Sequence, residues 1–209
     1  MVAKKRFPNY FGQLRIYSIV DLILLLVALS VGVREFIGVV FLHLSFILYL
    51  EFRHRHSNRE SFYPWLWIVL LIVGGLFYFK LAVLGFIVAS FLYTEKNKSL
   101  GYFAPVFRGF QSYFLIGGLI GFSSPLVFLV SGLMLVRNLA GDFRDTEKDK
   151  KEGMKTLPIL LGLKKGSRYV HIIFLMITSF AWWYLSGVSV LWLVLAYVIE
   201  LLTYNLTPR

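Results

Sequence analysis

The sequence predicts an all-α fold, a polytopic membrane bundle of about eight transmembrane helices in which residues 1–209 form a single integral membrane domain. Composition is the first observation behind this prediction. Hydrophobic residues make up 58% of the chain, aromatic residues 18% and charged residues only 16%, and the mean hydropathy is +0.71. Soluble domains carry about 45–50% apolar and about 25% charged residues. Long apolar runs and a one-sided distribution of basic residues are the other two observations.

Eight apolar runs account for most of the chain, and each predicts a membrane-spanning helix. A straight crossing of the membrane needs about 20 apolar residues. They cover residues 16–33, 36–50, 62–79, 81–93, 110–122, 125–140, 169–186 and 188–204. The run at 81–93 is short enough to be a buried or re-entrant segment. The run at 110–122 is expected to begin earlier, near Tyr102, if Arg108 and Gln111 face protein instead of lipid.

The basic residues indicate how the helices cross the membrane. If the N-terminus is inside and every run crosses, only Arg34 and Lys80 of the 22 Lys and Arg residues lie outside. Cytoplasmic loops carry the excess of Lys and Arg, so we expect both termini to be cytoplasmic. The net charge of +11 follows from this topology, and the basic residues form no stripe of the kind that binds nucleic acid. Cysteine is absent, which excludes disulfides and thiol chemistry.

An acidic stretch directly follows the run at 125–140. In a helix, with about 100° between successive residues, four of its oxygen-bearing side chains fall within about 60° of one another. These are Asn138, Asp142, Asp145 and Asp149. Three like charges on one face repel, so a cation is expected beside them. The alternative is a solvated acidic turn, balanced by its own Lys and Arg neighbours.

Magnesium suits this acidic face. Mg²⁺ prefers oxygen ligands, keeps several waters, and is usually held by one or two carboxylates together with substrate phosphates. The three aspartates therefore also suit a diphosphate bridged by the metal. Cations from the preceding inner loop would complete the neutralisation, and the candidates are Lys96, Lys98 and Arg108.

A second polar segment follows the run at 36–50, which gives the chain a faint internal repeat. Its polar residues recur at helical spacing and so share one face of a helix. They are Glu51, His54, Arg55 and Asn58. The positive-inside topology places both polar segments on the cytoplasmic side, where two polar faces could confront each other at a single cavity.

The acidic stretch resembles a known motif. Its pattern, Asn138-x3-Asp142-x2-Asp145-x3-Asp149-x3-Gly153-x2-Thr156-Leu157-Pro158, is similar to the second aspartate-rich motif of the UbiA-type intramembrane prenyltransferases. The segment from Leu14 to Ser18 with Asp21 resembles the start of that family's first helix. Tyr93-x2-Lys96, followed by Pro105 and Arg108-Gly109, is similar to its connection between the fourth and fifth helices.

The resemblance implies a helical bundle around a central cavity, in which aspartate-rich motifs coordinate Mg²⁺ on a prenyl diphosphate. The diphosphate ionises and the prenyl group alkylates a lipid-soluble acceptor. By this resemblance, the catalytic residues are Asp142, Asp145 and Glu51, and the metal ligands are Asp142, Asp145, Asp149 and Glu51. The residues expected to bind the diphosphate are Lys96, Arg108, Arg55, Asn138 and Arg15. We expect a multi-pass protein of a prokaryotic cell membrane, with its site toward the cytoplasm.

The chain departs from the family in two places. The first aspartate-rich motif normally carries an Asn and two Asp, whereas here the corresponding residues are Ile47, Glu51 and Arg55, with a single carboxylate. The family's last helix also has no counterpart among the eight predicted helices, so a lateral opening to lipid or a partner subunit is expected instead.

Other functions fit parts of the pattern. A catalytically degenerate homologue fits the single carboxylate of the first motif. A CDP-alcohol phosphotransferase also uses spaced aspartates, but its pattern begins Asp-Gly, whereas Asp142 is followed by Phe-Arg-Asp. An ion-coupled carrier would place ionisable groups near mid-membrane, whereas the acidic stretch lies at the inner boundary. Neither the acceptor nor the prenyl length is specified by the sequence.

Overall fold

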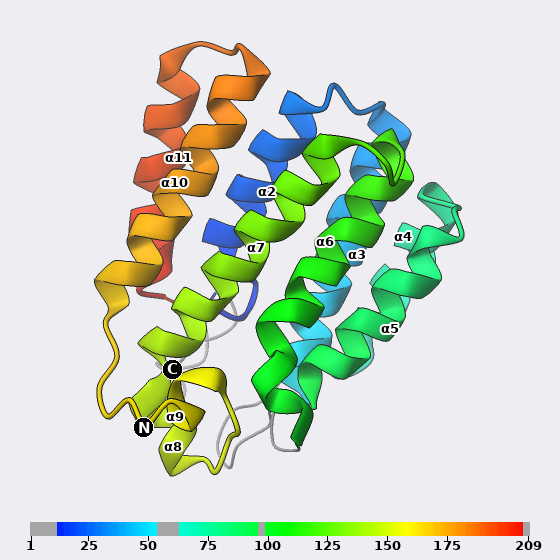
Figure 1. The fold of residues 1–209 in the computed structure, drawn as a ribbon. Helices are drawn as coiled ribbons and strands as arrows, with labels where there is room; N and C mark the ends of the chain where they lie inside the picture. Colours follow the sequence, from blue (N-terminus) through cyan, green and yellow to red (C-terminus); the bar gives the residue numbers. More distant parts are fainter. Residues whose placement is uncertain (1–11, 54–62, 96–98, 207–209) are drawn as a thin grey trace, which may run out of the picture. The chain divides into compact units, whose positions relative to one another are not determined.

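Each of the eight apolar runs forms a helix in the computed structural model (Figure 1). In chain order these helices are α2 (Ile16–Ala28), α3 (Val33–Arg53), α4 (Leu66–Phe77), α5 (Ala82–Thr94), α6 (Ala104–Ile120), α7 (Pro125–Arg144), α10 (Arg168–Ser186) and α11 (Val190–Tyr204). Three short helices join them: η2 (Ser99–Phe103), α8 (Thr146–Lys151) and α9 (Leu157–Leu160). The structure describes residues 12–53, 63–95 and 99–206, and within these ranges it contains no strand, which confirms the all-α class.

Helix boundaries follow from local sequence. α6 begins at Ala104 and buries Gln111, as the sequence predicts for a run that starts before residue 110. It ends at Gly121, whose φ of +92° is strained for any residue with a side chain. α7 then begins with Pro125 in its first turn, where the missing N–H has no helical partner to lose.

Three helices, α3, α7 and α10, are long and apolar enough to cross a membrane by length and composition. Helices α2, α4, α5 and α11 are apolar but shorter. Many large apolar side chains remain exposed, among them Leu76, Tyr184 and Leu202. A helical membrane protein accounts for such a surface, because lipid covers it. The count of eight spans and the cytoplasmic termini stay predictions.

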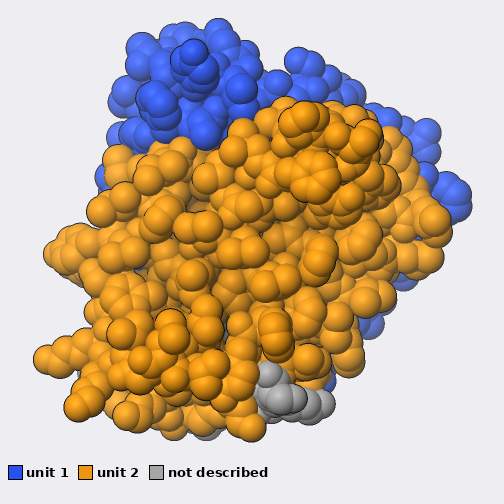
Figure 2. All heavy atoms as spheres, in the orientation of Figure 1, with its two compact units in different colours: residues 1–79, 179–209 blue, residues 80–178 orange. Residues whose placement is uncertain are grey.

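The chain divides into two compact units, coloured separately in Figure 2. Unit 1 comprises residues 1–79 and 179–209, and unit 2 comprises residues 80–178, so the boundary falls within α10. In unit 1, α2 packs against α3 and α11, and α3 packs against α4. In unit 2, α6 packs against both α5 and α7, while α9 contacts α7, α8 and η2. The single-domain prediction stays a prediction.

Two glycines allow the close approach of α3 and α4 in unit 1. A Cβ on Gly38 would lie 2.6 Å from Cβ of Tyr78, and a Cβ on Gly74 would lie 2.9 Å from the backbone nitrogen of Leu42. Small residues at such contacts let membrane helices pack backbone to backbone. This pairing fixes α3, which carries Glu51 in its last turn.

Candidate functional site

The acidic stretch lies at the end of α7 and in α8, both in unit 2. The stretch is not one regular helix, because Asp145 (φ −90°, ψ 7°) interrupts it between Arg144 and Thr146. The hydrogen bonds nevertheless keep helical spacing across the break. The amide of Asp145 donates to the carbonyl of Gly141 at 3.1 Å, and the amide of Asp149 donates to the carbonyl of Asp145 at 2.8 Å. Asn138 and Asp142 therefore share one face of α7, and Asp145 is the joint that connects α7 to α8.

Burial distinguishes these carboxylates from a solvated acidic turn. Asp142 is only 3% exposed and Asp149 is 9% exposed, although both lie in a strongly charged segment. The outward side of α8 behaves differently, with Lys148 and Glu152 forming a surface ion pair at 4.0 Å. A buried carboxylate is costly unless cations or hydrogen-bond donors compensate it, so Asp142 and Asp149 have surroundings unlike those of a solvated turn.

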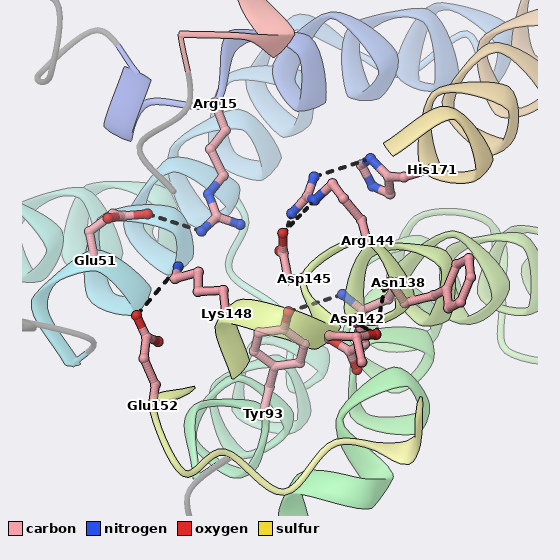
Figure 3. Close-up of polar contacts among 12 residues, drawn as sticks. Arg15, Glu51, Tyr93, Asn138, Asp142, Arg144, Asp145, Lys148, Glu152 and His171 are labelled. Carbon is pink, nitrogen blue, oxygen red and sulfur yellow. Dashed lines mark hydrogen bonds and ion pairs between the residues drawn. The ribbon is translucent and has the colours of Figure 1, made fainter. Parts of the chain in front are cut away.

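Asn138 connects the acidic stretch to α5. Its Nδ2 donates to the hydroxyl oxygen of Tyr93 at 3.0 Å (Figure 3). Its Oδ1 is buried and accepts no hydrogen bond from any residue that the structure describes. A buried amide oxygen that accepts no hydrogen bond is costly. It can bind a cation or accept from a donor, whereas the oxygens of a diphosphate are acceptors too and would repel it.

A second series of polar contacts in unit 2 reaches the same helix, α5. Arg108 on α6 donates to Oε1 of Gln111 at 2.8 Å, and Nε2 of Gln111 donates to Oγ of Ser90 at 2.8 Å. Ser90 and Tyr93 are three residues apart on α5 and so lie on one side of that helix. The hydrogen bonds that begin at Arg108 and the hydrogen bond of Asn138 therefore reach the same side of α5. The structure thus links two predicted diphosphate-binding residues to α5, Asn138 directly through Tyr93 and Arg108 indirectly through Gln111.

Arg144 and His171 belong to the site but were not identified from the sequence. Nε of Arg144 donates to Oδ1 of Asp145 at 2.8 Å, and its Nη2 donates to Oδ2 of the same carboxylate. Its Nη1 lies 3.3 Å from Nδ1 of His171 in the first turn of α10 (Figure 3). The sequence places His171 26 residues beyond Asp145 in an apolar run, and no local pattern links the two.

In unit 1, two other predicted site residues contact each other. Nη2 of Arg15 donates to Oε1 of Glu51 at 3.0 Å, so the predicted diphosphate ligand and the predicted metal ligand form an ion pair. Arg15 has φ +47°, in the left-handed region that a residue with a side chain adopts only when its surroundings hold it there. His54, Arg55 and Asn58 of this polar face, and Lys96 of unit 2, lie outside the described residues.

Unit 1 also contains a buried polar cluster that the sequence did not reveal. Ser179 on α10 contacts two carboxylates, Oδ1 of Asp21 at 3.2 Å and Oε1 of Glu200. Asp21 is 0% exposed and Glu200 is 1% exposed. Glu200 is therefore a buried partner of the serine hydroxyl. The cluster joins α2, α10 and α11.

Among the described residues, no three His, Asp or Glu side chains converge into a set that would by itself hold a metal ion. The donors at the end of α7 are instead of the kind Mg²⁺ uses when substrate phosphates complete its coordination: buried carboxylate and amide oxygens. The residues fit Mg²⁺ in that limited sense: Asp142, Asp149 and Asn138 present buried oxygens, and Asp145 presents a carboxylate that Arg144 binds in this structure.

Comparison of the chain with protein-family models, with curated proteins and with solved structures gave no match.

Proposed function

We propose that the protein is an intramembrane prenyltransferase that transfers a prenyl group from a prenyl diphosphate to a lipid-soluble acceptor, with Mg²⁺ assisting departure of the diphosphate. The observation that carries the proposal is the burial of Asp142, one helical turn from the buried amide oxygen of Asn138, together with the burial of Asp149 in the short helix that follows a helix long enough to span a membrane. A solvated turn has no need of buried carboxylates, whereas a site for a metal-bound diphosphate does.

The chain's own residues divide the work of such a reaction. Asp142, Asp145, Asp149 and Asn138 present oxygen donors, and Arg108 supplies positive charge toward the diphosphate. When bound, Mg²⁺ stabilises the negative charge that develops on the leaving diphosphate. The allylic cation left behind requires apolar walls and aromatic faces, and the chain has 20 Phe, 12 Tyr and 5 Trp from which to build them.

The proposal includes the finer membrane arrangement expected from the sequence: eight spans around a central cavity, in a prokaryotic cell membrane, with the site toward the cytoplasm. The positive-inside distribution of Lys and Arg supports this side. The acceptor and the prenyl length stay open. A basic cytoplasmic rim also suits the approach of an amphiphilic diphosphate from the inner leaflet.

A catalytically degenerate diphosphate-binding homologue is the second candidate, and one contact favours it. Glu51, the single carboxylate of the first polar face, is bound to Arg15, and its side chain is 8% exposed. A carboxylate neutralised in this way is a poorer metal ligand than the aspartate pair of the family motif. Such a protein would bind a prenyl diphosphate through Asp142 and Asp149 without turning it over.

Product analysis distinguishes an active prenyltransferase from a degenerate homologue. Purified protein is incubated with a panel of isoprenoid diphosphates, a mixed pool of acceptors and Mg²⁺. We expect prenyl transfer that EDTA abolishes and that Asp145→Asn abolishes, while Glu147→Gln, on the exposed side of α8, leaves it intact. Diphosphate binding without turnover supports the degenerate homologue. Turnover that neither EDTA nor Asp145→Asn affects would refute the metal-diphosphate site.

A further inference from the structure

We propose that Arg144 exchanges the Asp145 carboxylate for the diphosphate of the incoming substrate, so that metal and diphosphate bind to this site together and not independently. This inference rests on the proposed function and deepens it. Arg144 donates hydrogen bonds to both carboxylate oxygens of Asp145, through Nε at 2.8 Å and through Nη2.

Arg144 and a metal ion compete for the same atoms. A two-point bond between a guanidinium and a carboxylate is among the stronger polar contacts in proteins. The pair is also largely removed from water, with the side chain of Arg144 10% exposed and that of Asp145 23% exposed, so screening by solvent is small. A divalent cation that uses Asp145 must therefore first displace the guanidinium.

His171 keeps the guanidinium close to the site during this exchange. Arginine has only donors, so Nδ1 of His171 accepts from Nη1 of Arg144, and the ring carries no proton on that nitrogen. His171 is 6% exposed, and its ring lies close to α7 at Gly141, where an added Cβ would be 3.4 Å from Cδ2 of the ring. The ring is thus held against α7 at Gly141. His171 is a positioning residue, because it acts through Arg144.

The exchange couples the two ligands. A divalent cation arriving alone leaves a buried guanidinium without its carboxylate, which opposes binding. A diphosphate arriving with the cation gives Arg144 a new anion that it recognises through the same planar donors. By linkage, each ligand then raises the affinity for the other by the same factor, and couplings of this kind are typically about 5–150-fold.

The test measures binding without turnover. Mn²⁺, as a paramagnetic substitute for Mg²⁺, is titrated into purified protein in detergent micelles with and without inorganic pyrophosphate. Protein-bound Mn²⁺ is measured by equilibrium dialysis and electron paramagnetic resonance, and matched solutions without protein correct for the Mn²⁺ that pyrophosphate itself chelates. We expect pyrophosphate to raise the Mn²⁺ affinity of the wild type by about 5–150-fold. Arg144→Gln should bind Mn²⁺ alone at least as tightly as the wild type and should lose most of this enhancement.

Three further variants make the outcome specific. Arg168→Gln removes an exposed arginine from the same helix as His171 and should keep the full coupling. His171→Phe should reduce the coupling, and His171→Asn, which restores an acceptor, should recover part of it. Arg144→Lys keeps the charge but not the two-point contact, so it should give partial coupling even if Arg144→Gln folds poorly.

The outcomes separate the inference from the proposed function. Full coupling in a folded Arg144→Gln or Arg144→Lys protein, with Mn²⁺ binding still dependent on Asp145, would overturn the exchange and leave the metal-diphosphate site standing. A wild type that binds no Mn²⁺ in the presence of pyrophosphate would overturn the proposed function and the exchange with it.

Discussion

Gly74→Ala, compared with Gly75→Ala, tests the helix packing that positions α3. At Gly74, an added Cβ would lie 2.9 Å from the backbone nitrogen of Leu42 and 3.0 Å from the carbonyl oxygen of Gly38. Backbone atoms cannot move aside as side chains do, so α3 and α4 must separate. At Gly75, one residue further along the same helix, the added Cβ has no heavy atom of the described residues within 4 Å apart from its chain neighbours and its own helix backbone.

The two variants share the gain in helix propensity, about 0.8–1.0 kcal/mol for Gly→Ala, so their difference isolates the cost of overpacking. That cost is about 1–3 kcal/mol for a methyl group forced into a well-packed contact. Gly75→Ala should therefore be slightly stabilised, and Gly74→Ala should unfold at a temperature about 2–12 °C lower than Gly75→Ala.

Thermal unfolding of both variants in the same detergent, followed by circular dichroism, measures this difference. Equal unfolding temperatures for the two variants would refute the close packing of α3 on α4, as would a lower temperature for Gly75→Ala.

Three other substitutions probe the polar contacts. Tyr93→Phe removes the hydroxyl that accepts a hydrogen bond from Asn138, and such a bond contributes about 0.5–1.5 kcal/mol. The Mg²⁺ concentration for half-maximal turnover should therefore rise by about 2–13-fold. An unchanged Mg²⁺ requirement would contradict the contact. Ser179→Ala should lower the free energy of unfolding by about 1–3 kcal/mol, measured by thermal unfolding, with turnover retained; a protein as stable as the wild type would argue against the buried cluster. Gln111→Leu should raise the KM for prenyl diphosphate by releasing Arg108, and a kcat effect alone would contradict that role.

The helices could be predicted from the sequence because a long apolar run that lies in lipid must satisfy its backbone hydrogen bonds internally, which a helix does. The earlier start of α6 was also predictable, since Arg108 and Gln111 are polar residues at helical spacing next to an apolar run. The break at Asp145 was not, because neither Gly nor Pro marks it and the helical hydrogen-bond spacing continues through it.

The partners of the polar side chains could not be predicted, because they depend on contacts between helices far apart in sequence. Asp21 and Ser179 are 158 residues apart, and Arg15 and Glu51 are 36 residues apart. Arg137 is a further example, because it is a charged residue inside the predicted helix at 125–140 and no pattern in the sequence indicates its partner. In the structure it lies within α7, is 6% exposed, and donates to Thr178 at 3.3 Å. Charge patterns along a sequence indicate the side of a membrane but not the neighbours of a residue.

The end of α7, we propose, binds a diphosphate through Mg²⁺. Titration calorimetry with a non-hydrolysable prenyl thiolodiphosphate, in the presence and absence of Mg²⁺, tests this claim for the wild type and for Asp142→Asn. We predict binding that requires Mg²⁺ and that weakens at least about tenfold in Asp142→Asn, the equivalent of about 1.4 kcal/mol. Equal affinity without Mg²⁺, or in Asp142→Asn, would contradict the claim.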